Sequence, residues 1–209
     1  IVTTVIEQRA SLDVCKRLER QGFEVTAVPV QPDGLIDVDE IRRALTDKTI
    51  LISVMFANNE IGTIQDIAAV GKLAKEKGII FHTDATQAVG KIPIDVEAMG
   101  IDLLSSTAHL IYGPKGVGAL YVRRKNPRVR IAPMIDGGGH ERGMRSGTLN
   151  VPGIVGFGKA AELCRLEMEA ATKRPPGVRA RLNQKPHKGP DEISINGSLE
   201  RRPPSNPNI

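Results

Sequence analysis

Short apolar runs alternate with amphipathic stretches over the first three quarters of the chain. The apolar runs have strand length and include several β-branched residues: "FEVTAVPV", "TILISVM", "IIFHTD", "IDLLSST" and "GVGALYVRR". Because "TILISVM" is apolar almost throughout, it is typical of a strand that is buried on both faces. Turn residues such as "QPDG" follow the first run. These runs predict the strands of one sheet.

The amphipathic stretches between the runs predict helices. In "DVDEIRRAL", Asp37 is placed to cap a helix, and Glu40 three residues later would complete a capping box. "DIAAVGKLAKEKG" has helical spacing and ends on Gly78, which suits a left-handed C-cap. "DVEAMG" predicts a short helix, and Asn150 would cap a long one through "VPGIVGFGKAAELCRLEMEA". This alternation predicts an α/β fold with a mostly parallel sheet flanked by helices.

Composition excludes several classes of function. Aromatic residues make up 3% of the 209 residues and tryptophan is absent, so recognition of single-stranded nucleic acid by stacking has few residues to use. No apolar run approaches the roughly 20 residues that a membrane span needs. The opening "IVTTVIEQRA" has no signal-peptide pattern, so we expect a cytoplasmic protein without a membrane partner.

The two cysteines, Cys15 and Cys164, lie far apart in helix-like stretches. This separation argues against a disulfide framework and against a metal cluster. We expect each to be a buried helix residue with ordinary thiol behaviour and expect no metal site.

The positive charge is concentrated near the end of the chain. Residues 165–209 hold nine of the 29 Lys and Arg residues and five of the 24 Asp and Glu residues, which leaves 20 against 19 for the rest. Seven of the 14 prolines lie there too, and such a composition resists regular structure. We therefore divide the chain into a core, 1–168, and a Pro-rich basic tail, 169–209. The tail is either a solvated segment or a site for an acidic partner or nucleic acid, and its composition favours the first.

Three polar clusters follow successive strands. They are "NNE" after "TILISVM", "TDATQ" after "IIFHT" and "STAH" after "IDLLS". Each has a structural explanation: the Asn pair as turn chemistry, Asp84 as the cap of a short helix in "ATQAVG", and His82 as a packed side chain. Because ligands bind beyond the carboxyl ends of parallel strands, three clusters there also indicate one shared polar site.

A fourth feature, "GGGHERGMRSGT", combines consecutive glycines with donors for an anion. A phosphate group would suit Arg142, Arg145 and the neighbouring hydroxyls. A flexible hinge explains the glycines equally well but gives no reason for the two arginines. No Walker pattern is present, and no Gly-x-Gly-x-x-Gly opens a helix after a strand, so nucleotide binding has little support.

Four of these segments carry a family resemblance. "FANNEIGTIQDI", "FHTDATQAVGKIPID", "AHLIYGPKGVGALYVRR" and "GGGHERGMRSGT" together resemble the NifS/IscS-like cysteine desulfurases, pyridoxal-phosphate enzymes of the class V aminotransferase family. The resemblance runs from the first residue to about Met168, and "ISINGSLE" resembles a further fragment. It implies the core of the large domain of a fold-type I pyridoxal-phosphate enzyme. Its N-terminal part would be missing, and the tail would be a remnant of the start of the C-terminal domain.

The resemblance assigns roles around the cofactor ring. Asp84 would keep the pyridine nitrogen protonated, because a cationic ring is the better electron sink. Gln87 and Asn59 would hold the phenolic oxygen of the ring and orient the substrate.

The resemblance also assigns residues that would bind the cofactor phosphate. Thr107 and His109 would hydrogen-bond the phosphate in their own subunit. Thr148 would reach the phosphate of the neighbouring subunit, which implies a homodimer with sites at the interface.

Two positions depart from the family pattern. Leu110 stands where the family has the Schiff-base lysine, and a leucine has neither a nucleophile nor a group that moves protons. Gln8 stands where the family has a histidine that stacks on the ring, and an amide does not titrate near neutrality. Lys115, five residues after Leu110, belongs to the "GPKG" turn that the family shares, so we expect it to keep its own place. No catalytic residue is therefore expected to be intact.

The resemblance implies conversion of cysteine to alanine, with the sulfur passed as a persulfide to an iron–sulfur scaffold or another sulfur-acceptor protein. We expect this chain to be inactive and its cofactor, if bound, to be weak and non-covalent, because of Leu110 and because the region of the acceptor cysteine has no counterpart. A non-catalytic interaction protein that uses the family's dimer surface is the alternative. A nucleic-acid binder that uses the basic tail is less favoured.

Overall fold

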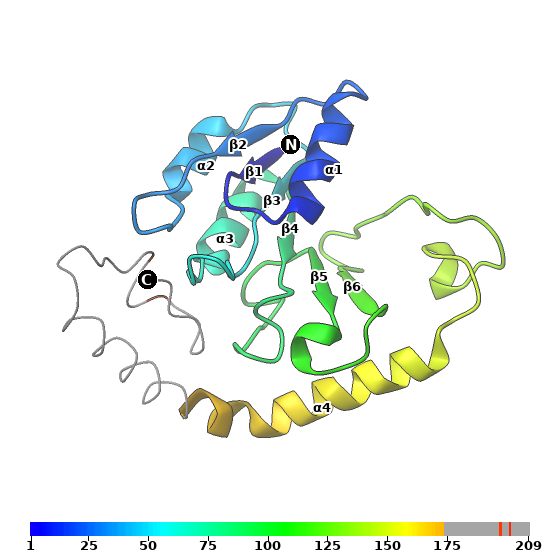
Figure 1. Cartoon of the computed structure of the whole chain (residues 1–209). Helices are drawn as coiled ribbons and strands as arrows, with labels where there is room; N and C mark the ends of the chain where they lie inside the picture. Colours follow the sequence, from blue (N-terminus) through cyan, green and yellow to red (C-terminus); the bar gives the residue numbers. More distant parts are fainter. Residues whose placement is uncertain (174–196, 198–200, 202–209) are drawn as a thin grey trace.

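The structure, a computed structural model, describes residues 1–173, 197 and 201. Its centre is a six-stranded sheet in the order β2-β1-β3-β4-β5-β6 (Figure 1). The first five strands are parallel and β6 is antiparallel to β5, which confirms the predicted mostly parallel sheet. The strands are β1 (Val2–Thr4), β2 (Thr26–Val28), β3 (Leu51–Ser53), β4 (Ile80–Asp84), β5 (Leu103–Thr107) and β6 (Gly118–Val122).

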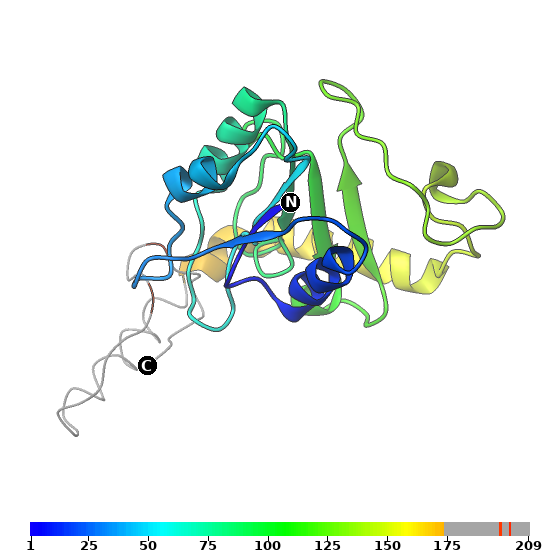
Figure 2. The same cartoon turned by 90° about the horizontal axis from the view of Figure 1, so that it is seen from above.

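Helices cover both faces of the sheet because the chain reverses direction at β1. It crosses outward from β1 to β2, then back past β1 to β3 and on to β4. Right-handed crossovers in opposite directions place their helices on opposite faces. Figure 2 shows α1 on one side of the sheet and α2 and α3 on the other. The helices are α1 (Arg9–Glu19), α2 (Val38–Ala44), α3 (Ile67–Lys77) and α4 (Val151–Lys173), with short 3₁₀ helices η1 (His109–Ile111) and η2 (Glu141–Gly143).

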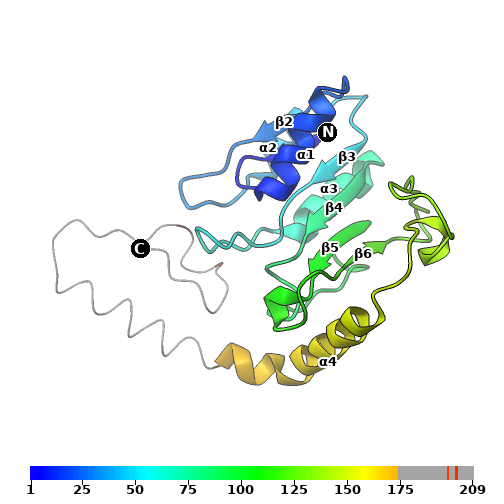
Figure 3. The same ribbon diagram turned by 45° about the vertical axis from the view of Figure 1, so that its right-hand side comes forward.

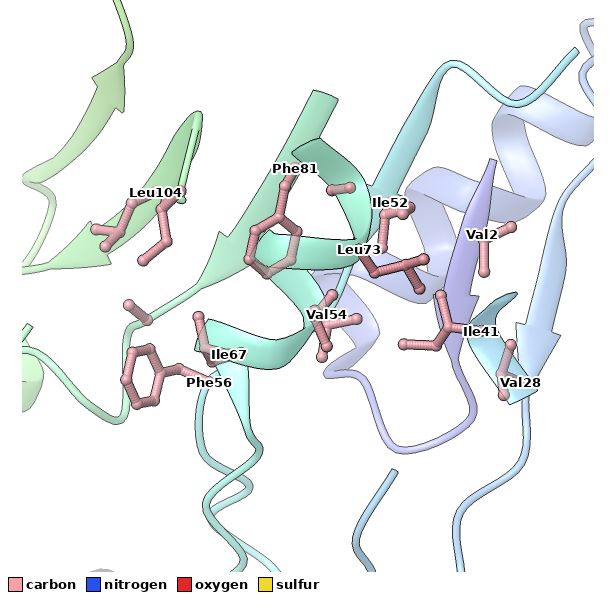
Figure 4. Close-up of a cluster of buried hydrophobic side chains, with 14 of the residues drawn as sticks. Val2, Val28, Ile41, Ile52, Val54, Phe56, Ile67, Leu73, Phe81 and Leu104 are labelled. Atoms are coloured by element: carbon pink, nitrogen blue, oxygen red, sulfur yellow. The ribbon is translucent and has the colours of Figure 1, made fainter. Parts of the chain in front are cut away.

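The hydrophobic core lies between the sheet and the pair α2 and α3. Ile41 of α2 and Leu73 of α3 belong to one cluster with Ile52 of β3 and Phe81 of β4 (Figure 4). All four side chains are fully buried. Burial of each such side chain stabilises the fold by about 1.5–3 kcal/mol, so this layer holds the central strands in place.

Three predicted helix ends are confirmed. Asp37 caps α2 by accepting a hydrogen bond from the amide of Asp39. Gly78 ends α3 with φ of +66°, the left-handed conformation expected of a glycine cap. Asn150 caps α4, because its side-chain oxygen accepts from the amide of Gly153 at 3.2 Å.

Three local predictions are wrong. Glu40 does not complete the capping box, because its carboxylate pairs with Arg43 at 2.6 Å, one turn further along α2. "ATQAVG" and "DVEAMG" form hydrogen-bonded turns and not helices. The left-handed glycines Gly90 and Gly100 end each stretch after about one turn.

The helix α4 continues to Lys173, five residues beyond the predicted end of the core. It contacts η1. In both Figure 1 and Figure 3, α4 passes along the end of β5 and β6 that lies next to η1. Most of the predicted tail, including all of "ISINGSLE" except Gly197, lies outside the described residues. Arg201 is described: its carbonyl accepts from the amide of Ile64, and its guanidinium pairs with Asp66 at 3.3 Å. The division at residue 168 stays a prediction.

Within the described part, none of the helices combines the length and the apolar character that crossing a bilayer requires.

The close approach of α3 to the turn before β5 gives a test of the packing. A Cβ atom at Gly71 would lie 2.0 Å from the carbonyl oxygen of Met99. We therefore expect Gly71→Ala to lower the free energy of unfolding by about 1–3 kcal/mol, although alanine is the better helix former by about 1 kcal/mol. Urea titration measures the change. Gly158→Ala on α4 is the matched control, because a Cβ atom there would meet no described atom within 4 Å beyond its neighbours and the backbone of its own helix. Equal effects of the two substitutions would contradict this packing.

Candidate functional site

The candidate site lies at the carboxyl edge of the sheet. The crossover direction reverses at β1, so the loops after β1 and β3 diverge at a topological switch point, where open α/β sheets bind ligands. Gln8 lies just after β1 and Asn59 on the loop after β3, while Asp84 and Thr107 end β4 and β5. The structure thus places the three predicted polar clusters along one edge.

An amide pair bridges the switch point. The side-chain nitrogen of Gln8 donates to the side-chain oxygen of Asn59 at 2.8 Å. The neighbouring Asn58 is buried, and its side chain binds the carbonyl of Ile6 and the amide of Glu60. Asn58 therefore stabilises the turn, as one of the two explanations for the Asn pair predicted, whereas Asn59 is exposed.

Asp84 is a buried carboxylate, with 7% of the residue exposed. Its Oδ1 accepts from the amide of Thr86 at 3.0 Å, an Asx turn in place of the predicted helix cap. Among residues 1–173, no lysine, arginine or histidine forms an ion pair with Asp84. Because a buried charge is costly without a partner, this environment favours a cationic group of a ligand.

His82 lies on the same face of β4 as Asp84, two residues earlier. Its two ring nitrogens bond the hydroxyls of Ser53 on β3 and Ser105 on β5, each at 2.8 Å. Burial lowers the pKa of His82, and the charge of Asp84 offsets part of that effect. His82 is thus a packed, neutral side chain that ties three strands together, as predicted.

Gln87 is oriented by a neighbouring lysine. The amine of Lys91 donates to the side-chain oxygen of Gln87 at 3.0 Å, which leaves the amide nitrogen of Gln87 to donate to a ligand. Burial lowers the pKa of Lys91.

The end of β5 supplies a hydroxyl and an imidazole. The Oγ1 of Thr107 lies 2.8 Å from the Nδ1 of the exposed His109. Leu110 follows in η1, is half-buried, and brings no polar atom to this end of the site. Lys115 lies on the exposed turn before β6.

Thr148 is not brought to this edge by the chain itself. It is exposed and belongs to the glycine-rich segment between β6 and α4, which projects away from the strand ends in Figure 1. Arg145 in that segment bonds only the nearby carbonyl of Gly147 among the contacts described for it. Arg142, Arg145 and Thr148 are thus exposed and separate from Thr107 and His109, whereas the hydroxyl of Ser146 is buried and accepts from the amide of Gly139.

Sequence reasoning missed Glu7. This residue is 5% exposed, and its Oε1 accepts from the hydroxyl of Thr4 at 2.8 Å and from the amide of Met55 at 2.7 Å. Burial raises the pKa of Glu7 to about 7, the charge of Asp84 adds to the rise, and the two hydrogen bonds oppose it. The only signal in the sequence is an acidic residue directly before Gln8 in "VIEQRA".

The described residues contain no group of three or more His, Cys, Asp or Glu side chains that could hold a metal ion. The two thiols are half-buried on α1 and α4, more exposed than predicted, and burial raises the pKa of each.

Comparison with known proteins gives a consistent result. The family model "Aminotransferase class-V" matches residues 1–201. Cysteine desulfurase IscS of Anaeromyxobacter sp. (strain K) is 56% identical over 209 residues, which is 100% of this chain and 52% of that protein. Cysteine desulfurase IscS of Proteus mirabilis (strain HI4320) is 54% identical over 209 residues, 51% of its length. The chain thus spans about half the length of the curated relatives it matches.

Solved structures share the fold. A NifS-like protein superimposes with a TM-score of 0.90 at 40% identity, covering 97% of this chain and 55% of that one. DndA from Streptomyces lividans gives a TM-score of 0.88 at 33% identity, covering 97% and 57%. SspA in complex with cysteine gives 0.74 at 45% identity, covering 77% and 46%.

The hydrogen-bonded, buried setting of His82 gives a prediction. We expect its imidazole to titrate below the usual pKa of 6.5, and Asp84→Asn to lower that pKa further, because the carboxylate favours the charged ring. Proton NMR of the imidazole resonances against pH measures both values. A pKa for His82 at or above 6.5, or one that rises in Asp84→Asn, would show that this environment is described wrongly.

Proposed function

Because this chain belongs to the class V aminotransferase family, we propose that it is the central part of the large domain of a pyridoxal-phosphate-dependent cysteine desulfurase. The whole enzyme would convert cysteine to alanine and pass the sulfur on as a persulfide. The observation that carries the proposal is Asp84, a buried carboxylate without a cationic partner among the described residues, at the end of the central strand β4.

The residues at the strand ends fit pyridoxal phosphate. A protonated pyridine nitrogen is the cationic group that Asp84 lacks. The amide nitrogen of Gln87 is available to donate to a phenolic oxygen, because Lys91 occupies its oxygen. The hydroxyl of Thr107 and the exposed imidazole of His109 lie close enough together to bind one phosphate.

When bound, pyridoxal phosphate supplies an electron sink for the α-carbon of the amino acid. Asp84 would hold the proton on the pyridine nitrogen, which makes that sink effective. Asn59, exposed on the loop after β3, would orient the substrate together with Gln87. Thr148 would complete the phosphate site of a second copy, in a homodimer, because within its own chain it is exposed and apart from Thr107.

We further propose that this chain does not turn over. Leu110 provides no amine to attach the cofactor or to move a proton at the substrate carbon. Gln8 bonds Asn59 and offers a smaller surface to the ring than a histidine does. Cys15 and Cys164 are the only cysteines, and both sit on helices with raised pKa values, so neither thiol is poised as a nucleophile. Binding of the cofactor would be non-covalent and weak.

The second candidate is a non-catalytic interaction protein. The observation that favours it is a set of large apolar side chains that are exposed on α4 and at the residue before the cap of α4. They are Leu149, Val151, Ile154, Val155, Leu163 and Leu166. Such a face is typical of an interface. If the chain is part of a desulfurase, the family resemblance also implies a sulfur-acceptor or iron–sulfur scaffold protein as its partner and a cytoplasmic location.

Covalent attachment gives the first test. After mixing with pyridoxal phosphate and reduction with borohydride, we expect no label on the tryptic peptides that span His109 to Lys115, because Leu110 has no amine. Mass spectrometry of the digest locates any label. A stoichiometric label on Lys115 would show that this lysine replaces the missing amine and would overturn the inactive-site proposal.

Restoring the amine gives the second test. We expect Leu110→Lys to become yellow with excess pyridoxal phosphate and to be labelled at position 110 after reduction. We expect sulfide release from cysteine to stay at the level of free cofactor, because neither cysteine is placed to accept sulfur. Leu110→Met, similar in volume but without an amine, is the control and should carry no label at position 110 after reduction.

The outcomes separate the two candidate functions. If Leu110→Lys binds no cofactor, the pocket itself is lost and the interaction protein is favoured. Catalytic sulfide release by Leu110→Lys would show that the account of the cysteines is wrong.

A further inference from the structure

Three successive residues join the loop after β1 to the loop after β3. The backbone carbonyl of Ile6 accepts from the side chain of Asn58, and the carboxyl of Glu7 accepts from the backbone amide of Met55. The side-chain amide of Gln8 donates to the side-chain oxygen of Asn59. The lengths of these hydrogen bonds are 2.8, 2.7 and 2.8 Å. Glu7 is the middle and most buried member. The three bonds therefore form one tie across the topological switch point, and Glu7 is at its centre.

The two oxygens of Glu7 have different surroundings. Oε1 accepts two hydrogen bonds, from Thr4 and from Met55. Oε2 is buried and has no hydrogen-bond partner among the described residues. An ionised carboxylate would leave charge on an oxygen that nothing solvates, whereas a neutral acid places its proton there. Burial of an unpartnered oxygen therefore favours the protonated form, and it outweighs the two hydrogen bonds to Oε1, which favour the ionised form.

The titratable groups that face Glu7 reinforce this preference. Asp84 at the end of β4 places a second carboxylate nearby, and Cys15 of α1 faces Glu7 as a thiol. The contacts from β1 and β3 come from Thr4 and the amide of Met55, which are uncharged. No cation among the described residues pairs with Glu7. The surroundings of Glu7 therefore favour its neutral, protonated form.

We propose that Glu7 is a positioning residue of the candidate site: as a neutral acid it ties the loop that carries Gln8 to the loop that carries Asn59, and its ionisation opens that tie. Glu7 touches neither cofactor nor substrate in this account. It acts through the two loops. The tie exists without any ligand, whereas its consequence for pyridoxal phosphate rests on the proposed function.

The direction of the pH effect follows from linkage. The pKa of Glu7 rises from 4.5 to about 7 on folding, so the folded state holds the proton more tightly than the unfolded state. The stability that this proton confers is complete below pH 4.5 and is lost as the pH rises through 7. For these two values the folding equilibrium constant falls about tenfold between pH 6 and pH 8.

Urea unfolding at pH 6 and pH 8 tests the charge of Glu7. We expect the folding constant of the wild type to fall about tenfold more over this interval than that of Glu7→Gln, which keeps an accepting oxygen and carries no charge. Glu24→Gln, which removes an exposed carboxylate, should keep the wild-type dependence. A Glu7→Gln variant with the full wild-type dependence on pH would overturn the proposal.

Hydrogen exchange of the Met55 amide tests the tie itself. At pH 8 we expect this amide to exchange several-fold faster in the wild type than in Glu7→Gln, and at pH 6 at nearly equal rates. A purely structural role of the hydrogen bond would not produce a difference that depends on pH. Equal rates at both pH values would overturn the proposal.

Binding of pyridoxal phosphate separates this inference from the proposed function. We expect the ratio of the dissociation constants of wild type and Glu7→Gln to rise between pH 6 and pH 8, because the wild-type loops open as Glu7 ionises. Equal ratios would show that the tie does not position the site. If neither protein binds pyridoxal phosphate at either pH, the proposed function fails, while unfolding and exchange still decide the role of Glu7.

Discussion

The reversal of the crossover direction at β1 is the constraint on which the site depends. Because the chain leaves β1 toward one edge of the sheet and reaches β3 on its other side, the loops after these two strands face each other with no strand between them. Residues 6–8 and 55–59 fill that position and bond each other. The hydrophobic layer under α2 and α3 fixes the strands, and the strand ends in turn place every polar group of the site.

Charge is distributed at this edge by burial. Burial raises the pKa of Glu7 and lowers that of His82, so both side chains favour their neutral forms. The two hydrogen bonds to Glu7 oppose this effect, as does the charge of Asp84 at His82. Asp84 is a buried carboxylate at the end of β4, and no cation among the described residues pairs with it. A cationic group of a ligand would supply that partner although the residue at 110 is leucine.

The sequence predicted those features of the fold that depend on residues close together in the chain. The helix caps form as expected at Asp37, Gly78 and Asn150, because capping depends on residues within one turn. The strand β1 was not predicted, since three residues of "VTT" become a strand only through pairing with β2 and β3. Glu7 was missed for a related reason: its importance comes from Met55, 48 positions away, and from burial that no neighbouring residue reveals.

We propose that the strand ends still form a pocket for pyridoxal phosphate around Asp84. Equilibrium titration of the chain with pyridoxal phosphate, followed by the ³¹P resonance of the phosphate, tests it most directly when the wild type is compared with Asp84→Ala. The account predicts saturable binding of one cofactor per chain that Asp84→Ala weakens at least about tenfold, the scale of a lost charge-assisted hydrogen bond. Binding of equal strength in the two proteins, or no saturable binding in the wild type, would contradict it.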